Sequence, residues 1–258
     1  MTHSTRSISA YTRVADLQRE EVELHPGVVS FRFDLAMTLF HLAQDHLDVD
    51  QPKESLRYAQ EGTERLEALL FTDKDPLGQA RSLLGMIWEK RAEALVALGR
   101  ENEAVEALEA AIRHQGKALE QDPRSDDYKE QLFNHSYHLV ALRCIMGQAN
   151  EAASSLEAME PLWPAKPGKL FSDAQELARG WSKATVAAGG RTRRPGTATL
   201  LYGALVVTML ERSVNVGFRD FSRLINDPAF EAFRARDDFQ RLLIRTMDLA
   251  FPIDALAR

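Results

Sequence analysis

Two consecutive segments of helical periodicity, joined by a glycine, constrain the fold of this chain more than any other feature. The first helix is predicted over residues 77–98 and the second over residues 102–119, with a turn at Gly99. Ala92 on the first helix and Ala104 on the second are small enough to let two helices approach closely. The two segments are therefore predicted to pack as an antiparallel hairpin.

The apolar residues of this hairpin follow a large, small, large order on the first helix and an Ala-x3-Leu-x2-Ala order on the second. They are Trp88, Ala92 and Leu95 on the first helix, and Ala104, Leu108 and Ala111 on the second. This order is the tetratricopeptide repeat (TPR) pattern, and it predicts that Trp88 is buried between the two helices. Each helix also carries a second apolar stripe, which a lone hairpin would leave exposed. Further copies of the hairpin are therefore expected beside it.

Turn signals recur along the chain at nearly constant spacing. The turns between the first helix of a pair (helix A) and the second (helix B) fall at Asp50, Gly99 and Gly147, which are 49 and 48 residues apart. A standard TPR has about 34 residues, so these hairpins have longer helices. We predict an all-α fold, a TPR-like superhelix of long helical hairpins.

The chain is predicted to have a repeat region and a C-terminal cap. The repeat region covers residues 1–188, and the helical cap, packed on the array, covers residues 197–258. The expected elements of the repeat region are a half hairpin over 9–24, hairpins over 29–71, 77–119 and 127–162, and a helix over 172–187. A repeat array needs a terminus with one polar face, which the cap would supply.

The predicted cap is rich in aromatic residues and in helix-capping signals. Asp220 and Asp237 precede short helical patterns and are predicted to cap them. Gly217 is expected to end the helix before the cap. The aromatic core is expected to consist of Phe218, Phe221, Phe230, Phe233 and Phe239.

Five stretches share a pattern with one protein family. They are AYTRVADLQREEVELHPGVVSFRFDLA (10–36), LGRENEAVEALEAAI (98–112), MGQANEAASSLEAM (146–159), LERSVNVGFRDFSRLINDPAFEAFRARDDFQRLL (210–243) and LAFPIDALAR (249–258). They resemble the C-terminal TPR regions of planctomycete serine/threonine protein kinases. The resemblance implies a region that mediates protein interactions in bacterial signalling. The glycine-rich, His-Arg-Asp and Asp-Phe-Gly motifs of the kinase domain itself are missing from this sequence.

Composition argues against several classes of partner and compartment. The net charge of −6 is not that of a nucleic-acid-binding protein, which usually presents a basic face. The most apolar run, Leu200–Leu210, is too short to span a membrane. The chain has a single cysteine, Cys144, and its start lacks the apolar region of a signal peptide, so a cytoplasmic location is expected.

Motifs for catalysis, metals or cofactors are weak. Ser182 lies in a Gly-Trp-Ser-Lys-Ala sequence, but a nucleophile elbow needs a preceding strand and this segment reads as helix. His135 and His138 could share a metal, but a third ligand is missing. We expect no enzyme, no metal and no cofactor.

The inner face of the array is the candidate binding surface, because helix A lines it in TPR solenoids. The residues predicted to line it are Phe40, Gln44, Glu89, Glu93 and Tyr137. Glu89 and Glu93 are four apart and are expected to be exposed, unpaired and mutually repulsive. This strip suits a peptide with some basic character. Alternatively, Phe40 and Tyr137 simply pack between repeats.

Three hypotheses follow for function. The first is a non-catalytic scaffold that binds protein or peptide. The second is the regulatory or docking region of a serine/threonine kinase, separated from its catalytic domain. The third is an enzyme of a kind not recognised from its motifs, which uses the inner face for chemistry.

Overall fold

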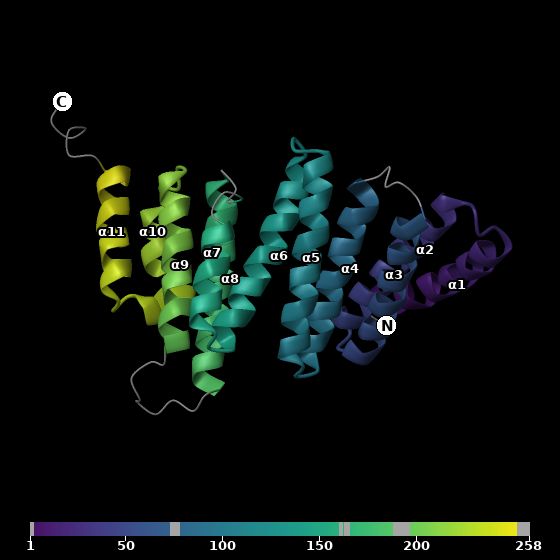
Figure 1. Cartoon of the computed structure of the whole chain (residues 1–258). Helices are drawn as coiled ribbons and strands as arrows, with labels where there is room; N and C mark the ends of the chain where they lie inside the picture. The colour runs from purple at the N-terminus through teal and green to yellow at the C-terminus, as the bar shows by residue number, and fades with distance from the viewer. Residues whose placement is uncertain (1–2, 73–77, 160–161, 163–165, 188–196, 252–258) are drawn as a thin grey trace. The chain divides into compact units, whose positions relative to one another are not determined.

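The computed structural model describes residues 3–72, 78–159, 162, 166–187 and 197–251, and every structural statement below concerns these residues. They contain eleven α-helices and one 3-10 helix, η2, and no strand (Figure 1). The fold is therefore an all-α array of helical hairpins, as the sequence predicts.

The structure divides into two compact units, residues 1–139 and 140–258, and each is described by itself. The predicted division between repeat region and cap falls at residues 188–197. All but the last of these lie outside the described residues, so that division stays a prediction.

The first unit is built from five helices and most of a sixth. They are α1 (His3–Leu24), α2 (Val29–Asp48), α3 (Pro52–Thr72), α4 (Gly78–Ala97), α5 (Glu101–Gln121) and α6 (Asp126–Ile145), which continues into the second unit. Helix α2 packs against α3, α4 packs against α5, and α2 also lies beside α4. These two helix pairs correspond to the hairpins predicted over 29–71 and 77–119, and α1 begins six residues earlier than expected, at His3.

The turns between paired helices explain the residues found there. Asp50 and Gly99 have φ of 58° and 71°, the left-handed conformation that glycine adopts freely and aspartate tolerates. Beyond them, the Gln51 amide donates to the His46 carbonyl at 2.8 Å, and the Arg100 amide donates to the Leu95 carbonyl at 2.9 Å. These bonds satisfy the last carbonyl groups of helix A and reverse the chain.

Small residues let neighbouring helices pack closely in the first unit. Ala92 and Ala104 are buried, as predicted. A Cβ atom at Gly62 would lie 3.1 Å from Ile87 Cδ1, so this glycine lets α4 approach α3. The expected full burial of Trp88 is wrong: it is half-buried, and the Arg91 guanidinium lies 4.6 Å above its ring centre. This cation–π contact favours keeping the ring where the guanidinium can reach it.

The helices of the second unit vary more in length than those of the first. After α6 come α7 (Ala149–Met159), α8 (Pro167–Ala187), α9 (Thr197–Asn215), α10 (Phe221–Asn226), η2 (Pro228–Phe233) and α11 (Asp237–Ala250). The hairpin expected to end at residue 162 ends its second helix at Met159. Helix α8 begins at Pro167 rather than at residue 172, because proline is well suited to the first helical turn.

The aromatic core of the second unit includes one residue absent from the predicted list. Phe230, Phe233 and Phe239 are fully buried, while Phe218 is half-buried. The additional member is Phe171 of α8, fully buried, whose ring stacks on Phe218 with centres 4.3 Å apart. The C-terminal helices therefore pack on α8 through this ring.

The capping predictions were right at two positions and wrong at one. Asp220 accepts a hydrogen bond from the Arg223 amide at 2.8 Å, and Gly217, with φ of 118°, follows the end of α9. Asp237 does not cap α11, because it is the first residue of that helix. The neighbouring Asp238 instead forms an ion pair with Arg236 at 2.7 Å.

Throughout the described part of the chain, the helices are too short or too polar to cross a membrane.

Candidate functional site

The two predicted site residues on α2 lie at the surface only in part. Phe40 and Gln44 are both half-buried. The ring of Phe40 meets His41 edge-on at 5.3 Å, and the Gln44 amide donates to Asp48 at 2.9 Å. Their proposed role in ligand binding stays a prediction.

Glu89 differs most from its predicted state. It is 7% exposed, and its Oε1 atom lies 2.7 Å from His138 Nδ1. The Nδ1 atom of the fully buried His135 lies 3.0 Å from the same oxygen, in an ion-pair contact less well aligned than a hydrogen bond. The expectation of an exposed, unpaired carboxylate is therefore wrong, because α6 supplies two partners.

Burial and pairing act on the Glu89 carboxylate in opposite directions. Burial alone raises the pKa of Glu89, but its interactions with His135 and His138 outweigh burial and hold the pKa far below the ordinary value. For His138 the signs are reversed. Burial lowers the pKa of this imidazole, but the hydrogen bond to Glu89 outweighs burial and raises the pKa. The pair is therefore stabilised in its charged form.

A glycine on α4 makes room for this cluster. A Cβ atom at Gly85 would lie 3.4 Å from His135 Nε2 and 3.2 Å from the Ala111 carbonyl oxygen. Both distances are at or below ordinary van der Waals contact, so the absence of a side chain lets α5 and α6 close over α4 at this level.

Glu93 and Tyr137 also have partners within the protein. Lys90 Nζ lies 2.6 Å from a Glu93 carboxylate oxygen, so the predicted repulsion between unpaired Glu89 and Glu93 does not arise. Tyr137 is 8% exposed and its ring stacks near Phe133, with centres 6.3 Å apart. Tyr137 is therefore buried rather than open on the surface, and the alternative that it packs between repeats, like its role in binding, stays a prediction.

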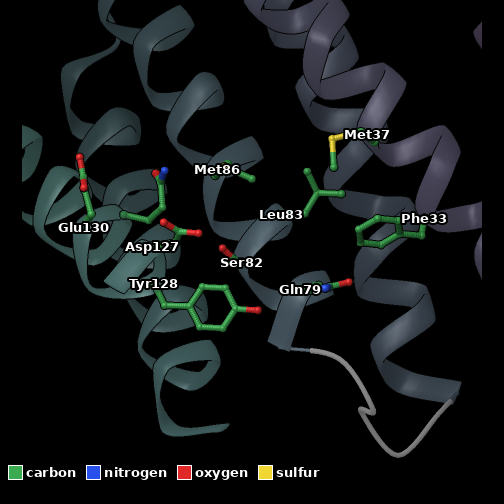
Figure 2. A pocket seen from close by; sticks show the side chains of 10 residues that line it. Phe33, Met37, Gln79, Ser82, Leu83, Met86, Asp127, Tyr128 and Glu130 are labelled. Carbon is green, nitrogen blue, oxygen red and sulfur yellow. The ribbon is translucent and has the colours of Figure 1, made fainter. Parts of the chain in front are cut away.

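A groove opens instead along the first halves of α2, α4 and α6 (Figure 2). Its volume is about 590 Å³. It is lined by Phe33 and Met37 of α2, by Gln79, Ser82, Leu83 and Met86 of α4, and by Asp127, Tyr128, Glu130 and Gln131 of α6. All three helices are the first of their pairs, which agrees with the predicted inner face but not with the predicted residues.

The two sides of the groove differ in chemistry. Figure 2 shows Phe33, Met37 and Leu83 on one side, and Asp127 and Glu130 on the other. The α2 side is therefore apolar and the α6 side acidic, with polar residues of α4 between them.

Tyr128 is positioned against the beginning of α4. A Cβ atom at Gly78 would lie 3.2 Å from the Tyr128 ring and 3.3 Å from its hydroxyl, so the glycine leaves room for the phenol. The backbone carbonyl of Tyr128 accepts a hydrogen bond from the Gln115 amide at 3.2 Å. Burial, together with Asp122 and Asp127, raises the pKa of Tyr128, so the phenol stays protonated and can donate.

A signal for the groove was present in the sequence. Met37 and Met86 are 49 residues apart, which is the spacing of the first two turns, so they occupy corresponding positions on α2 and α4. Methionine at a repeated, half-buried position is typical of adaptable binding surfaces. The predicted site residues lie in the second halves of the same helices, so the prediction did not include the groove.

Ser182 and Cys144 were the other residues considered for chemistry. Ser182 lies within α8, not at a strand-to-helix turn. Cys144 is buried, which raises the pKa of its thiol to about 11 and keeps it protonated at neutral pH. Within the ranges that the structure describes, no three His, Cys, Asp or Glu side chains are arranged to hold a metal ion.

The chain resembles solved structures in fold, although it has no match among family models. Searches against protein-family models and against curated proteins find no match. Among solved structures, the chain is similar to that described as the crystal structure of BtubC (BKLC) from P. vanneervenii, with a TM-score of 0.55 and 15% identity. The similarity covers 100% of this chain and 93% of that chain. At this level of identity it supports the helical fold.

Proposed function

We propose that this protein is a non-catalytic scaffold of TPR type that binds a protein or peptide ligand in the groove between α2, α4 and α6. The observation that carries the proposal is the groove itself, which lies on three successive first helices and has one apolar and one acidic side. Repeat arrays use such faces for ligands because each repeat adds side chains at regular intervals.

The walls of the groove are formed by packed helices, which hold the lining side chains in place before a ligand binds. Leu83 and Ser82 are buried and form part of a packed helix surface, while Met37 and Met86 keep part of their apolar area exposed. A site on packed helices loses little freedom when a ligand enters, which lowers the cost of binding. The volume of about 590 Å³ lies in the range of ordinary ligand sites, roughly 300–1,000 Å³.

Capture from the native cell lysate tests the proposal, provided that a groove variant accompanies the wild type. Gln79→Arg places a long side chain at an exposed position of the groove lining. Gln60→Arg is the matched control, since Gln60 is exposed on α3 and does not line the groove. Proteins retained by wild type and Gln60→Arg but lost from Gln79→Arg are the expected result. An identical set retained by all three proteins would contradict the proposal.

In a narrower form of the proposal, the ligand belongs to a serine/threonine kinase pathway, as the sequence resemblance implies. A kinase reading frame directly upstream of this gene, or a kinase among the proteins lost from Gln79→Arg, would support that form. If the proteins lost from Gln79→Arg include no kinases or kinase substrates, the kinase form of the proposal is contradicted, while the scaffold proposal still stands.

A further inference from the structure

We infer that the groove recognises a short extended peptide segment carrying a bulky apolar side chain and, about three residues away, an arginine or lysine. This inference rests on the proposed function and specifies its ligand. It follows from the chemistry of the two sides of the groove and from the distance between them.

The acidic side supplies the charge complementarity. The ten lining residues include two carboxylates, Asp127 and Glu130, and no lysine, arginine or histidine. Tyr128 follows Asp127 on the same helix, is half-buried and also lines the groove. A guanidinium can pair with a carboxylate and lie over an aromatic ring at once, so arginine is the better occupant of this side.

The same two carboxylates act against other ligands. An acidic or phosphorylated peptide would bring like charge into a groove whose described lining residues include no basic side chain to receive it. Juxtaposed like charges disfavour a wrong partner, so the acidic side selects against such peptides as well as for basic ones.

The apolar side supplies an anchor point. Phe33, Met37 and Met86 each keep part of their surface exposed around the buried Leu83. Two flexible thioether side chains accommodate several shapes, so this side selects a large apolar residue rather than one particular residue.

The spacing follows from helix geometry. Helix α2 lies beside α4, and the bond from His138 to Glu89 shows that α6 lies beside α4 as well. Packed helices are about 8–10 Å apart, and an extended chain advances about 3.3 Å per residue. An apolar side chain seated between α2 and α4 is therefore about three residues from a cation that faces α6.

The test uses a phage-displayed library of random heptapeptides panned against the full chain. Enriched peptides are then synthesised and titrated calorimetrically against three proteins. These are the wild type, the groove variant Asp127→Asn/Glu130→Gln, and the matched control Asp126→Asn/Glu120→Gln. The control removes the same charge from exposed residues of α6 and α5 that do not line the groove.

Enriched peptides should carry an arginine or lysine about three positions from a large apolar residue. The groove variant should weaken their binding about fivefold at low salt, since two exposed charge pairs contribute about 0.5 kcal/mol each and 1.4 kcal/mol is tenfold. The difference should shrink in 1 M salt, where screening acts over about 3 Å. The control should stay within about twofold of the wild type.

Two outcomes separate this inference from the proposed function. Peptides that lose binding to Gln79→Arg but carry no basic residue, or bind the groove variant as tightly as the wild type, would overturn the inference and leave the groove as the site. Peptides that bind Gln79→Arg as tightly as the wild type, or a library without enrichment, would overturn the proposed function itself.

Discussion

The first and second halves of helices α2, α4 and α6 differ in how accessible their side chains are. In the first halves, Met37, Met86 and Asp127 line an open groove. In the second halves, Glu89 is closed off by His138. Both regions carry polar and apolar residues on the first helices of the pairs. What separates them is whether a side chain meets a complementary group on the neighbouring helix.

The closed region shows why a polar residue on an expected binding face can be structural. A buried carboxylate without partners would be costly, whereas one that accepts a hydrogen bond and a second close contact is retained. Glu89 therefore joins α4 to α6, and the surface left for ligands lies nearer the beginnings of the helices. The predictions below test this division between a closed and an open region.

The largest effect is expected at Tyr137 in the closed region. Tyr137→Ala should lower the free energy of unfolding by about 3–5 kcal/mol, because it removes a large buried ring. Tyr128→Ala, which truncates the half-buried tyrosine of the groove, should cost about 1 kcal/mol. Urea denaturation measures both. Equal losses of unfolding free energy in the two variants would mean that the closed region and the groove are packed alike.

Glu89 should come next. Glu89→Gln should cost about 2–3 kcal/mol, because an amide cannot provide the charge that holds His138. The control is Glu93→Gln, which breaks a partly exposed pair with Lys90 and should cost less than about 1 kcal/mol. A Glu89→Gln protein as stable as Glu93→Gln would show that Glu89 belongs to the open surface after all.

The same pair should make stability depend on pH in two directions. The pKa of Glu89 is lowered by folding, so its contribution is present above the unfolded carboxyl pKa of about 4.3 and is lost as pH falls. The pKa of His138 is raised, so its contribution is present below about pH 6.5 and is lost as pH rises through the folded value.

Thermal or urea unfolding between pH 5 and 9 should therefore show a loss toward alkaline pH in the wild type. The His138 side chain is 44% exposed, so solvent screening limits the effect to about 1 kcal/mol. The nearby charges of Glu93 and Lys90 act on His138 in opposite senses. The loss should disappear in His138→Gln, and a slope that persists in this variant would assign it to another group.

The smallest effect is expected for the charges of the groove. Asp127→Asn combined with Glu130→Gln should change the free energy of unfolding by less than about 0.5 kcal/mol, since surface substitutions rarely do more. Asp127 is in the first turn of α6, where a negative charge contributes a few tenths of a kcal/mol through the helix dipole. A loss comparable to that of Glu89→Gln would make the groove a structural region rather than a binding one.

The sequence was most informative where structure depends on nearby residues. Periodicity located the helices, and the residues at Asp50, Gly99 and Gly217 located their ends. It was less informative at Pro167, which begins α8 five residues before the predicted start at residue 172. Proline ends one helix and starts another equally well, so only the surrounding packing distinguishes the two cases.

The candidate site depended on contacts that local patterns do not contain. Glu89 and His138 are 49 residues apart, and their hydrogen bond requires α4 and α6 to be turned toward each other at that level. Phe171 likewise meets Phe218 across 47 residues. A helical wheel shows which residues share a face, but not the rotation of the neighbouring helix.

By itself, the sequence determined the all-α class, the hairpin spacing and the positions of the turns, because each depends on residues within a few helical turns of one another. Only the tertiary structure decided that Glu89 and Tyr137 are closed off while Met37 and Asp127 remain accessible. The reason is that burial of a side chain depends on what the adjacent helix presents to it. That is set by the packing of whole helices, in which glycines such as Gly85 determine how closely α4, α5 and α6 approach.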